Sequence, residues 1–167
     1  MEPLVDTVIE DDRWQAFGLE ARAESAARAT LAGLGLDPVG FQIVVMGCDD
    51  ARIASLNADF RGKPQPTNVL SWPAEDLSPD EPGGDPLPPE PGEPDDPESL
   101  GDIAIAWETC EREAAEQGKA MADHVTHLLV HGVLHLLGHD HIEEADATRM
   151  ESIEVRVLAT LGIADPY

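Results

Sequence analysis

A run of histidines inside an apolar stretch limits the structures open to this sequence more than any other feature. All six histidines fall between His124 and His141, and the densest part reads HGVLHLLGHDH from His131 to His141. Leucine and valine fill the positions between them, which favours a buried helix from Met121 to Leu137. His131 and His135 are four residues apart and therefore differ by only about 40° around such a helix. The sequence thus predicts two imidazoles on one helix face.

A third histidine follows the end of this helix. Gly138 favours a break there, after which the chain can turn back and bring His141 to the same point as His131 and His135. Three neutral imidazoles with a fourth position open for water are typical of a catalytic zinc ion, because structural zinc sites usually fill all four positions. We therefore predict one zinc ion per chain, bound by these three histidines. The alternative is that they are surface residues or hydrogen-bonded core residues.

The remaining histidines have simpler interpretations. His139 adjoins the predicted site and is an alternative ligand, but it shares a short turn with Asp140. We favour His141 as the ligand and Asp140 as a carboxylate that shapes the turn or supports a ligand. His127 lies one helical turn before the first predicted ligand, and hydrogen-bonded packing is its favoured role. His124, at the start of the helix, is expected to be exposed.

The residue after the first predicted ligand limits the kinds of hydrolysis that the predicted site could perform. In zinc peptidases of the H-E-x-x-H type, a glutamate at this position is the general base. Here the position is Gly132, so a peptidase mechanism would lack its base. A glycine inside a helix costs about 1 kcal/mol relative to alanine, and its presence indicates that another group approaches closely.

The rest of the chain alternates between strand-like and helix-like segments. Strands are expected at Pro3 to Ile9, Phe41 to Met46, Thr67 to Trp72 and Asp102 to Trp107. Helices are expected from Asp11 or Asp12 to Leu31, from Asp49 or Asp50 to Phe60, and at Glu108 to Gln117, Met121 to Leu137 and Glu143 to Leu161. These patterns predict a single α+β domain over residues 1–167. It would have about four strands in a mixed sheet, about five helices and a histidine helix like that of zincins.

An acidic, proline-rich stretch interrupts this pattern at about residues 75–99. Glu75 to Glu98 contains ten acidic residues and no basic one, and eight of the fourteen prolines lie between Ser78 and Ser99. Proline has no amide donor and like charges repel each other, so the stretch is predicted to be a disordered or extended insertion at the surface of the domain. A polyproline docking motif around Pro86 to Pro89 is a less favoured alternative.

Composition and charge exclude several classes of protein. The 167 residues contain 10 Lys+Arg against 34 Asp+Glu, a net charge of −24, which argues against a nucleic-acid coat protein and a membrane-surface binder. No apolar run reaches the ~18 residues of a membrane span, and the N-terminal sequence has no secretory signal. Cys48 and Cys110 form no metal or redox spacing. We expect a cytoplasmic protein with two reduced thiols.

Four blocks of the sequence resemble one known family. HGVLHLLGHDH is similar to the H-G-x-L-H-L-x-G-Y-D-H signature of the bacterial YbeY family, single-strand-specific endoribonucleases of ribosomal RNA maturation. The other three blocks are FRGKPQPTNVLSWP from Phe60 to Pro73, LGDIAIA from Leu100 to Ala106 and LGIADPY from Leu161 to Tyr167. Two departures stand out: His139 replaces the signature tyrosine, and KPQPT from Lys63 replaces the usual K-D-K-P-T run.

The resemblance implies a zinc-dependent endoribonuclease that acts in 3′-end maturation of small-subunit (16S) ribosomal RNA and in ribosome quality control. It implies the same zinc ligands, His131, His135 and His141, and a catalytic arginine at Arg61. The partners that it implies are single-stranded RNA, the ribosomal RNA precursor, and the small ribosomal subunit with its assembly factors. We expect no DNA and no membrane partner.

Arg61 also makes chemical sense in such a reaction. Zinc activates water without a carboxylate base, and a guanidinium can clamp the negative charge that builds on phosphoryl oxygens. The alternative for Arg61 is a surface charge at a helix end. Asp102 and Asn68 are assigned structural roles. For the whole protein, the alternatives are a non-catalytic, metal-stabilised ribosome-assembly factor and, less favoured, a peptidase-like zinc hydrolase.

Overall fold

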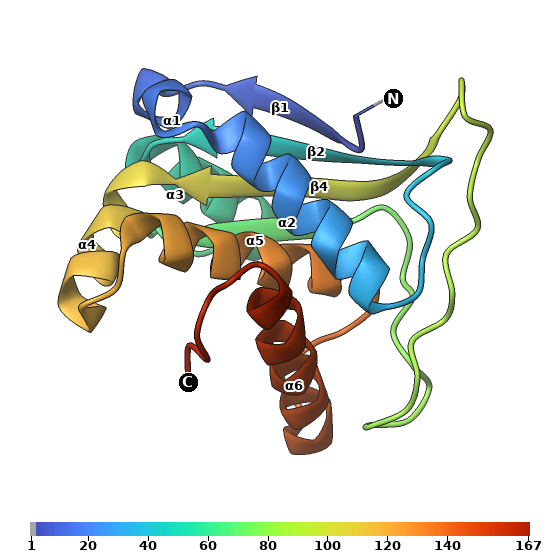
Figure 1. The fold of residues 1–167 in the computed structure, drawn as a ribbon. Coiled ribbons are helices and arrows are strands. Elements are labelled where there is room, and N and C mark those ends of the chain that lie inside the picture. The colour runs from blue at the N-terminus through green and yellow to red at the C-terminus, as the bar shows by residue number, and fades with distance from the viewer. Residues whose placement is uncertain (1–2) are drawn as a thin grey trace.

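The computed structural model describes residues 3–167 (Figure 1), so the first two residues of the predicted domain lie outside the described part. In chain order its elements are β1 (Val5–Ile9), α1 (Asp12–Phe17), α2 (Leu19–Gly33), β2 (Phe41–Cys48), α3 (Asp50–Arg61), β3 (Val69–Pro73), β4 (Glu98–Ala106), α4 (Trp107–Gln117), α5 (Met121–Leu136) and α6 (Glu144–Thr160). The predicted α+β class and the four-stranded mixed sheet are confirmed.

The sheet has the strand order β1-β2-β4-β3, in which β1, β2 and β4 are parallel. β3 is antiparallel to β4 and forms one edge of the sheet, with Trp72 opposite Asp102. α2 and α5 cover one face, α6 packs against both, and α3 lies on the other face (Figure 1). The histidine helix α5 thus lies directly against the sheet.

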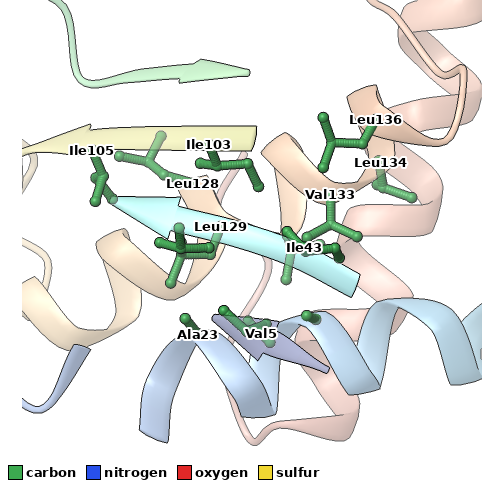
Figure 2. Packing of buried hydrophobic residues seen from close by; sticks show 14 of the residues in the cluster. Val5, Ala23, Ile43, Ile103, Ile105, Leu128, Leu129, Val133, Leu134 and Leu136 are labelled. Carbon is green, nitrogen blue, oxygen red and sulfur yellow. The ribbon is translucent and has the colours of Figure 1, made fainter. Parts of the chain in front are cut away.

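The main core fills the space between the sheet and α2, α5 and α6. Figure 2 shows Ile43 of β2 and Ile103 of β4 gathered with Leu129 and Val133 of α5, and each is at most 1% exposed. A smaller cluster, which includes Ile53 of α3, lies on the opposite face of the sheet. Burial of such side chains contributes roughly 1.5–3 kcal/mol each. α5 is therefore fixed to the sheet along most of its length.

The prediction of one helix from Asp11 or Asp12 to Leu31 is wrong in one respect, because this segment forms two helices, α1 and α2. Gly18 has φ +86°, a left-handed conformation that ends α1, and its N–H donates to Trp14 and Gln15 carbonyls. The break directs Trp14 into the core, where its Nε1 donates to the Cys48 carbonyl at 2.9 Å. The described residues consequently form six helices rather than five.

The acidic segment connects β3 to β4 as a loop whose side chains are mostly exposed. Two features attach this loop to the rest of the domain. Leu77 is buried at 5% exposure, and the Gly83 N–H donates to the Asp146 carboxylate of α6 at 2.7 Å. β4 begins at Glu98, earlier than predicted, so the last residues of the predicted insertion belong to the sheet. Disorder of the remaining loop stays a prediction.

Two expectations from composition concern the state of the cysteines and the presence of a membrane-spanning segment. Cys48 and Cys110 are free and buried. Burial raises the pKa of Cys48 to about 12 and the pKa of Cys110 further still, so both thiols are protonated at neutral pH. Within residues 3–167, no helix has the length and apolar character needed to cross a membrane.

Candidate metal centre

One stripe of α5 is left partly exposed, and it consists of histidines. His127, His131 and His135 follow one another at intervals of four and are half-buried, whereas most of the residues between them are buried. Residues at this spacing share one face of a helix. The ring of His141, from the turn after α5, lies beside the ring of His131 with centroids 5.1 Å apart. The three predicted ligands, His131, His135 and His141, thus lie on one side of α5.

The turn that returns His141 toward α5 depends on Gly138. Its φ is +97°, in the left-handed region that favours glycine. A Cβ at this position would lie 2.4 Å from the carbonyl oxygen of Leu77. Both the backbone conformation and the close approach of the acidic segment therefore require a glycine. Asp140 shapes the same turn, because its Oδ1 accepts a hydrogen bond from the Ile142 N–H at 3.2 Å.

A buried carboxylate on α6 supports the histidine stripe. Glu154 is 1% exposed, and its Oε2 lies 3.0 Å from Nδ1 of His131. Its Oε1 lies 2.5 Å from Nε2 of His127 and accepts a hydrogen bond from the Tyr167 hydroxyl at 2.6 Å. Burial opposes ionisation of Glu154, but the hydrogen bonds from His127, His131 and Tyr167 outweigh it and lower its pKa to about 2. Glu154 is therefore an ionised acceptor at neutral pH.

This carboxylate determines which nitrogen of His131 can bind a metal. Because ionised Glu154 can only accept hydrogen bonds, a neutral His131 carries its proton on Nδ1 and keeps the lone pair of Nε2. His135 also has an oxygen beside its Nδ1, because Oγ of Ser71 on β3 lies 2.5 Å away, and this hydroxyl can either donate or accept the hydrogen bond. Burial and then the positive charges of His131 and Arg61 lower the pKa of His135, which keeps its imidazole neutral.

The donor set fits a transition-metal ion. Within residues 3–167, the side chains as placed do not form a closed group of three or more ligands around one point. The chemistry of the donors nevertheless matches: His131 and His135 each have Nδ1 engaged by an oxygen, which is how metal-binding histidines are oriented, and each leaves Nε2 available. His141 is exposed and adds a third imidazole. Imidazole ligands suit zinc, copper, iron and nickel ions.

Gly132 explains how α5 approaches the sheet so closely. It is buried, and a Cβ there would lie 3.1 Å from Cδ1 of Ile103 on β4. The close approach predicted from this glycine is therefore confirmed. The position faces the core, so a glutamate at residue 132 would point its carboxylate at Ile103 instead of at a substrate. With glycine at residue 132, the chain has no glutamate at the position where a peptidase of the H-E-x-x-H type has its general base.

The structure corrects the prediction for His124 and locates the other two histidines. His124 was expected to be exposed, but it is 4% exposed because α4 packs against this end of α5, and its Nε2 lies 2.9 Å from Oε1 of Glu113. His127 is hydrogen-bonded to Glu154, as predicted. His139 is buried, and burial followed by the positive charge of Arg149 lowers its pKa.

Arg61, the predicted catalytic residue, is the last residue of α3 and is exposed. Among the described residues its guanidinium has no hydrogen bond or ion pair, although its charge reaches His135. The structure thus leaves Arg61 free to bind an anion near the histidines. Asp102 is exposed within β4 opposite Trp72, and Asn68 donates to Glu113 at 2.9 Å, so among the described residues neither has a hydrogen bond to a predicted metal ligand.

Sequence reasoning did not identify Glu154, Ser71 or Tyr167 as parts of the site. For Glu154 a signal was present: it lies within the apolar stripe of α6, next to Ile153 and one turn after Met150. A carboxylate on a buried helix face needs a partner, because burying an unpaired charge is very costly. Ser71 and Tyr167 lie in two of the blocks that resemble the family, but nothing in those blocks indicates a hydrogen-bond partner for either side chain.

An α+β domain with several imidazoles on one side of a helix, and an arginine that has no partner among the described residues, has the arrangement expected of a metal-dependent hydrolase. Comparison with known proteins agrees. The profile of the family Endoribonuclease YbeY matches residues 7–162. The chain is 67% identical over 167 residues to Endoribonuclease YbeY of Cereibacter sphaeroides, covering 100% of both chains. It is 60% identical over 163 residues to that of Dinoroseobacter shibae, covering 98% of this chain and 90% of the relative.

The chain therefore belongs to the YbeY family, whose members are hydrolytic endoribonucleases of ribosomal RNA processing and depend on a metal. The fold also matches a solved structure. A solution structure from Thermotoga maritima superimposes with a TM-score of 0.55 at 19% sequence identity, covering 95% of this chain and 91% of that one. At this identity the match supports the fold alone.

Proposed function

We propose that this chain, a member of a hydrolytic endoribonuclease family, is zinc-dependent and single-strand-specific and acts in 3′-end maturation of 16S ribosomal RNA and in ribosome quality control. The observation that carries this proposal is the combination of two imidazoles, each with Nδ1 held by an oxygen, with the guanidinium of Arg61, which has no hydrogen bond or ion pair among the described residues. The combination supplies both parts that phosphodiester hydrolysis needs, a place for a metal ion and a cation for the phosphate.

His131, His135 and His141 would hold one zinc ion per chain. When bound, zinc supplies Lewis acidity that activates water at neutral pH and polarises a phosphoryl oxygen. Glu154 and Ser71 act on the ligands: Glu154 accepts the Nδ1 proton of His131, and the Ser71 hydroxyl forms a hydrogen bond with Nδ1 of His135, so both rings are held in one orientation. Orientation matters because a misplacement of about 1 Å at a reacting centre can lower the rate ~10²-fold.

Arg61 would bind the phosphate whose ester bond is cleaved. Its guanidinium presents a planar fork of N–H donors that matches two phosphoryl oxygens, and no carboxylate among the described residues competes for it. As negative charge grows on those oxygens, the attraction of the guanidinium grows with it, which lowers the barrier. Lys63, exposed two residues later, adds a second positive charge to the same segment.

The proposed partners follow from this chemistry. They are single-stranded RNA, the ribosomal RNA precursor, and the small ribosomal subunit with its assembly factors, and the proposed location is the cytoplasm. The net charge of −24 repels nucleic acid at long range, so productive binding would depend on the few cations close to the histidines. This arrangement favours a substrate that is presented locally, as on a ribosomal particle, over binding to DNA in general.

Single-turnover cleavage by the zinc-loaded protein tests the proposal. The substrates are a short single-stranded RNA, the same sequence as a duplex, and a casein peptide, each with and without chelator. We expect cleavage of the single strand only, loss of cleavage with chelator, and recovery when zinc is restored. A zinc-loaded protein that leaves the single strand intact would support a non-catalytic assembly factor, and cleavage of the peptide would support a peptidase-like hydrolase.

The His131→Ala/His135→Ala variant should contain no zinc by elemental analysis, and unchanged zinc would contradict the ligand assignment.

A further inference from the structure

An exposed aromatic ring lies directly beside Arg61. Phe60, the preceding residue of α3, is 64% exposed. Its ring contacts the half-buried ring of Trp72 on β3, with centroids 5.3 Å apart and planes inclined at 62°. Trp72 packs in turn against the small core cluster beneath α3. Phe60 is therefore held in place by a fixed neighbour while most of its surface remains open to solvent.

The pair also lies close to the histidines. Trp72 directly follows Ser71, whose Oγ is 2.5 Å from Nδ1 of His135. Successive side chains of a strand point to opposite faces, so Ser71 lies on the α5 face of β3 and Trp72 on the α3 face. β3 is the edge of the sheet, and no further strand lies beyond it among the described residues. A flexible polymer that binds at the histidines can therefore reach the aromatic pair by passing around this edge.

We propose that Phe60 and Trp72 form a stacking platform for one unpaired nucleobase of the RNA, next to the phosphate bound by Arg61. This inference rests on the proposed function and names how the same site would recognise a single strand. Proteins that bind single-stranded nucleic acid combine cations along the backbone with aromatic rings on which bases stack. Segment 60–63 has this combination, because Phe60 is followed by the exposed cations Arg61 and Lys63.

The charges around the pair suit a base better than a second phosphate. Asp102 lies opposite Trp72 in the antiparallel ladder and is exposed. Its carboxylate would repel a phosphate there, whereas it can accept hydrogen bonds from the exocyclic amine of a base. In a duplex the bases are stacked on each other and paired, so a ring at the protein surface has no free base to bind. The platform thus gives the site a physical reason to prefer single strands.

Binding to metal-free protein tests this platform without relying on cleavage. In the presence of chelator, a short single-stranded RNA should quench the fluorescence of Trp72, and Trp72→Phe should remove that part of the signal. We expect Phe60→Ala to weaken single-strand binding by about 5- to 100-fold, the effect of losing one stacking partner. Phe60→Tyr keeps a ring and should bind like the wild type. Val39→Ala removes a side chain of similar exposure, 58%, from the connection between α2 and β2, and serves as the matched control.

Two further ligands make the outcome specific for stacking. Replacing the nucleobases of the oligonucleotide by abasic sites should lower wild-type affinity to that of Phe60→Ala, and a blunt duplex should show no difference between the two proteins. If wild-type protein cleaves single-stranded RNA while folded Phe60→Ala binds it with unchanged affinity, the platform is wrong and the proposed function stands. If Phe60→Ala weakens binding of single strands that the zinc-loaded wild type never cleaves, the platform stands and the proposed cleavage is wrong.

Discussion

Oε2 of Glu154 lies 3.0 Å from Nδ1 of His131, although 23 residues separate them in the chain. The same carboxylate holds Tyr167 and His127 through its other oxygen. Because Glu154 is almost fully buried on α6, its position does not depend on solvent or on a mobile side chain. A predicted metal ligand on α5 is thus oriented by a charge on a different helix, which makes the packing of α6 against α5 part of the proposed metal site.

Replacing Glu154 by glutamine should weaken metal binding. Glu154→Gln keeps the size of the side chain but removes the ionised acceptor, and the loss of such a partner typically costs 10- to 100-fold in metal affinity. Competition with a chromophoric chelator measures the affinity, and Glu144→Gln, an exposed change on the same helix, should leave it unchanged. In metal-free protein, nitrogen-15 NMR should find the His131 proton on Nδ1, and Glu154→Gln should shift the balance between its tautomers. Equal affinities for both variants would mean that Glu154 does not orient His131.

Arg61→Ala should separate catalysis from folding and metal content. Because Arg61 is exposed and bonded to no described residue, its removal should leave the melting temperature and the zinc content intact. Single-turnover RNA cleavage should nevertheless fall by ~10²–10³, the effect of losing one preorganised charge-stabilising donor. Arg61→Lys should recover little, since an ammonium cannot form a planar two-point contact. Arg52→Ala, also on α3, is the matched control, and near-normal cleavage by folded, zinc-loaded Arg61→Ala would return Arg61 to the role of a helix-end charge.

Glu24 should make the stability of the first strand depend on pH. Its carboxylate accepts hydrogen bonds from the N–H groups of Leu4 at 3.0 Å and Val5 at 2.8 Å. Burial opposes its ionisation, but these amide donors and Arg28 outweigh burial and hold the pKa of Glu24 below its usual value. Glu24→Gln leaves one acceptor oxygen for two amides, so the free energy of unfolding at pH 7 should fall by about 1–3 kcal/mol.

The direction of the pH effect follows from the lowered pKa of Glu24. The folded state favours the charged carboxylate, so its contribution is complete above the unfolded pKa of about 4.3 and is lost as the pH falls through the lower folded value. Urea unfolding should therefore show a constant difference between wild type and Glu24→Gln above about pH 5, and a shrinking difference below about pH 4. Glu20→Gln, an exposed change on the same helix, should show no such dependence. A difference that persists at low pH would show that the charge of Glu24 is irrelevant.

Most of the acidic loop should be dispensable for folding. Its contacts with α6 include the exposed ion pair of Asp85 with Arg149, and exposed pairs contribute only about 0–1 kcal/mol. Replacing Pro79 to Pro97 by a short Gly/Ser bridge retains the buried Leu77 and should lower the melting temperature by less than about 10 °C. Differential scanning calorimetry measures the change. A larger fall would show that the loop packs against the domain and is not a solvated insertion.

The parts of this fold that the sequence predicts well are those with local causes. Asp49 begins α3 because its side chain accepts from the Arg52 N–H at 2.8 Å, and Gly62 ends it in a left-handed conformation. Both signals lie within a few residues of the helix end that they determine. Gly18 is also a local signal, but an isolated glycine is often tolerated inside a helix. The break between α1 and α2 was therefore not predicted from it.

The supporting residues of the metal site could not be predicted because their contacts are distant in sequence. Ser71 and His135 are 64 residues apart, and they meet only because β3 lies at the sheet edge against α5. The burial of His124 likewise follows from where α4 places Glu113. The predicted histidine ligands were accessible to sequence reasoning, since the spacing of His131 and His135 encodes their shared helix face. The choice of predicted ligands thus rests on local sequence, whereas the orientation of their rings depends on tertiary structure.

The contact between Gly132 and Ile103 gives the interior of the protein a role in setting the reaction geometry. His131 and His135 are carried by α5, whereas Ser71 and Arg61 are carried by β3 and α3. The distance between these two groups depends on how closely α5 packs against β4. At residue 132 the close packing is possible because glycine has no side chain. A methyl group at 132, or a trimmed side chain at 103, would raise or lower the histidines as a unit. Protein engineers could therefore adjust this site from the core, without altering any residue that is proposed to contact RNA.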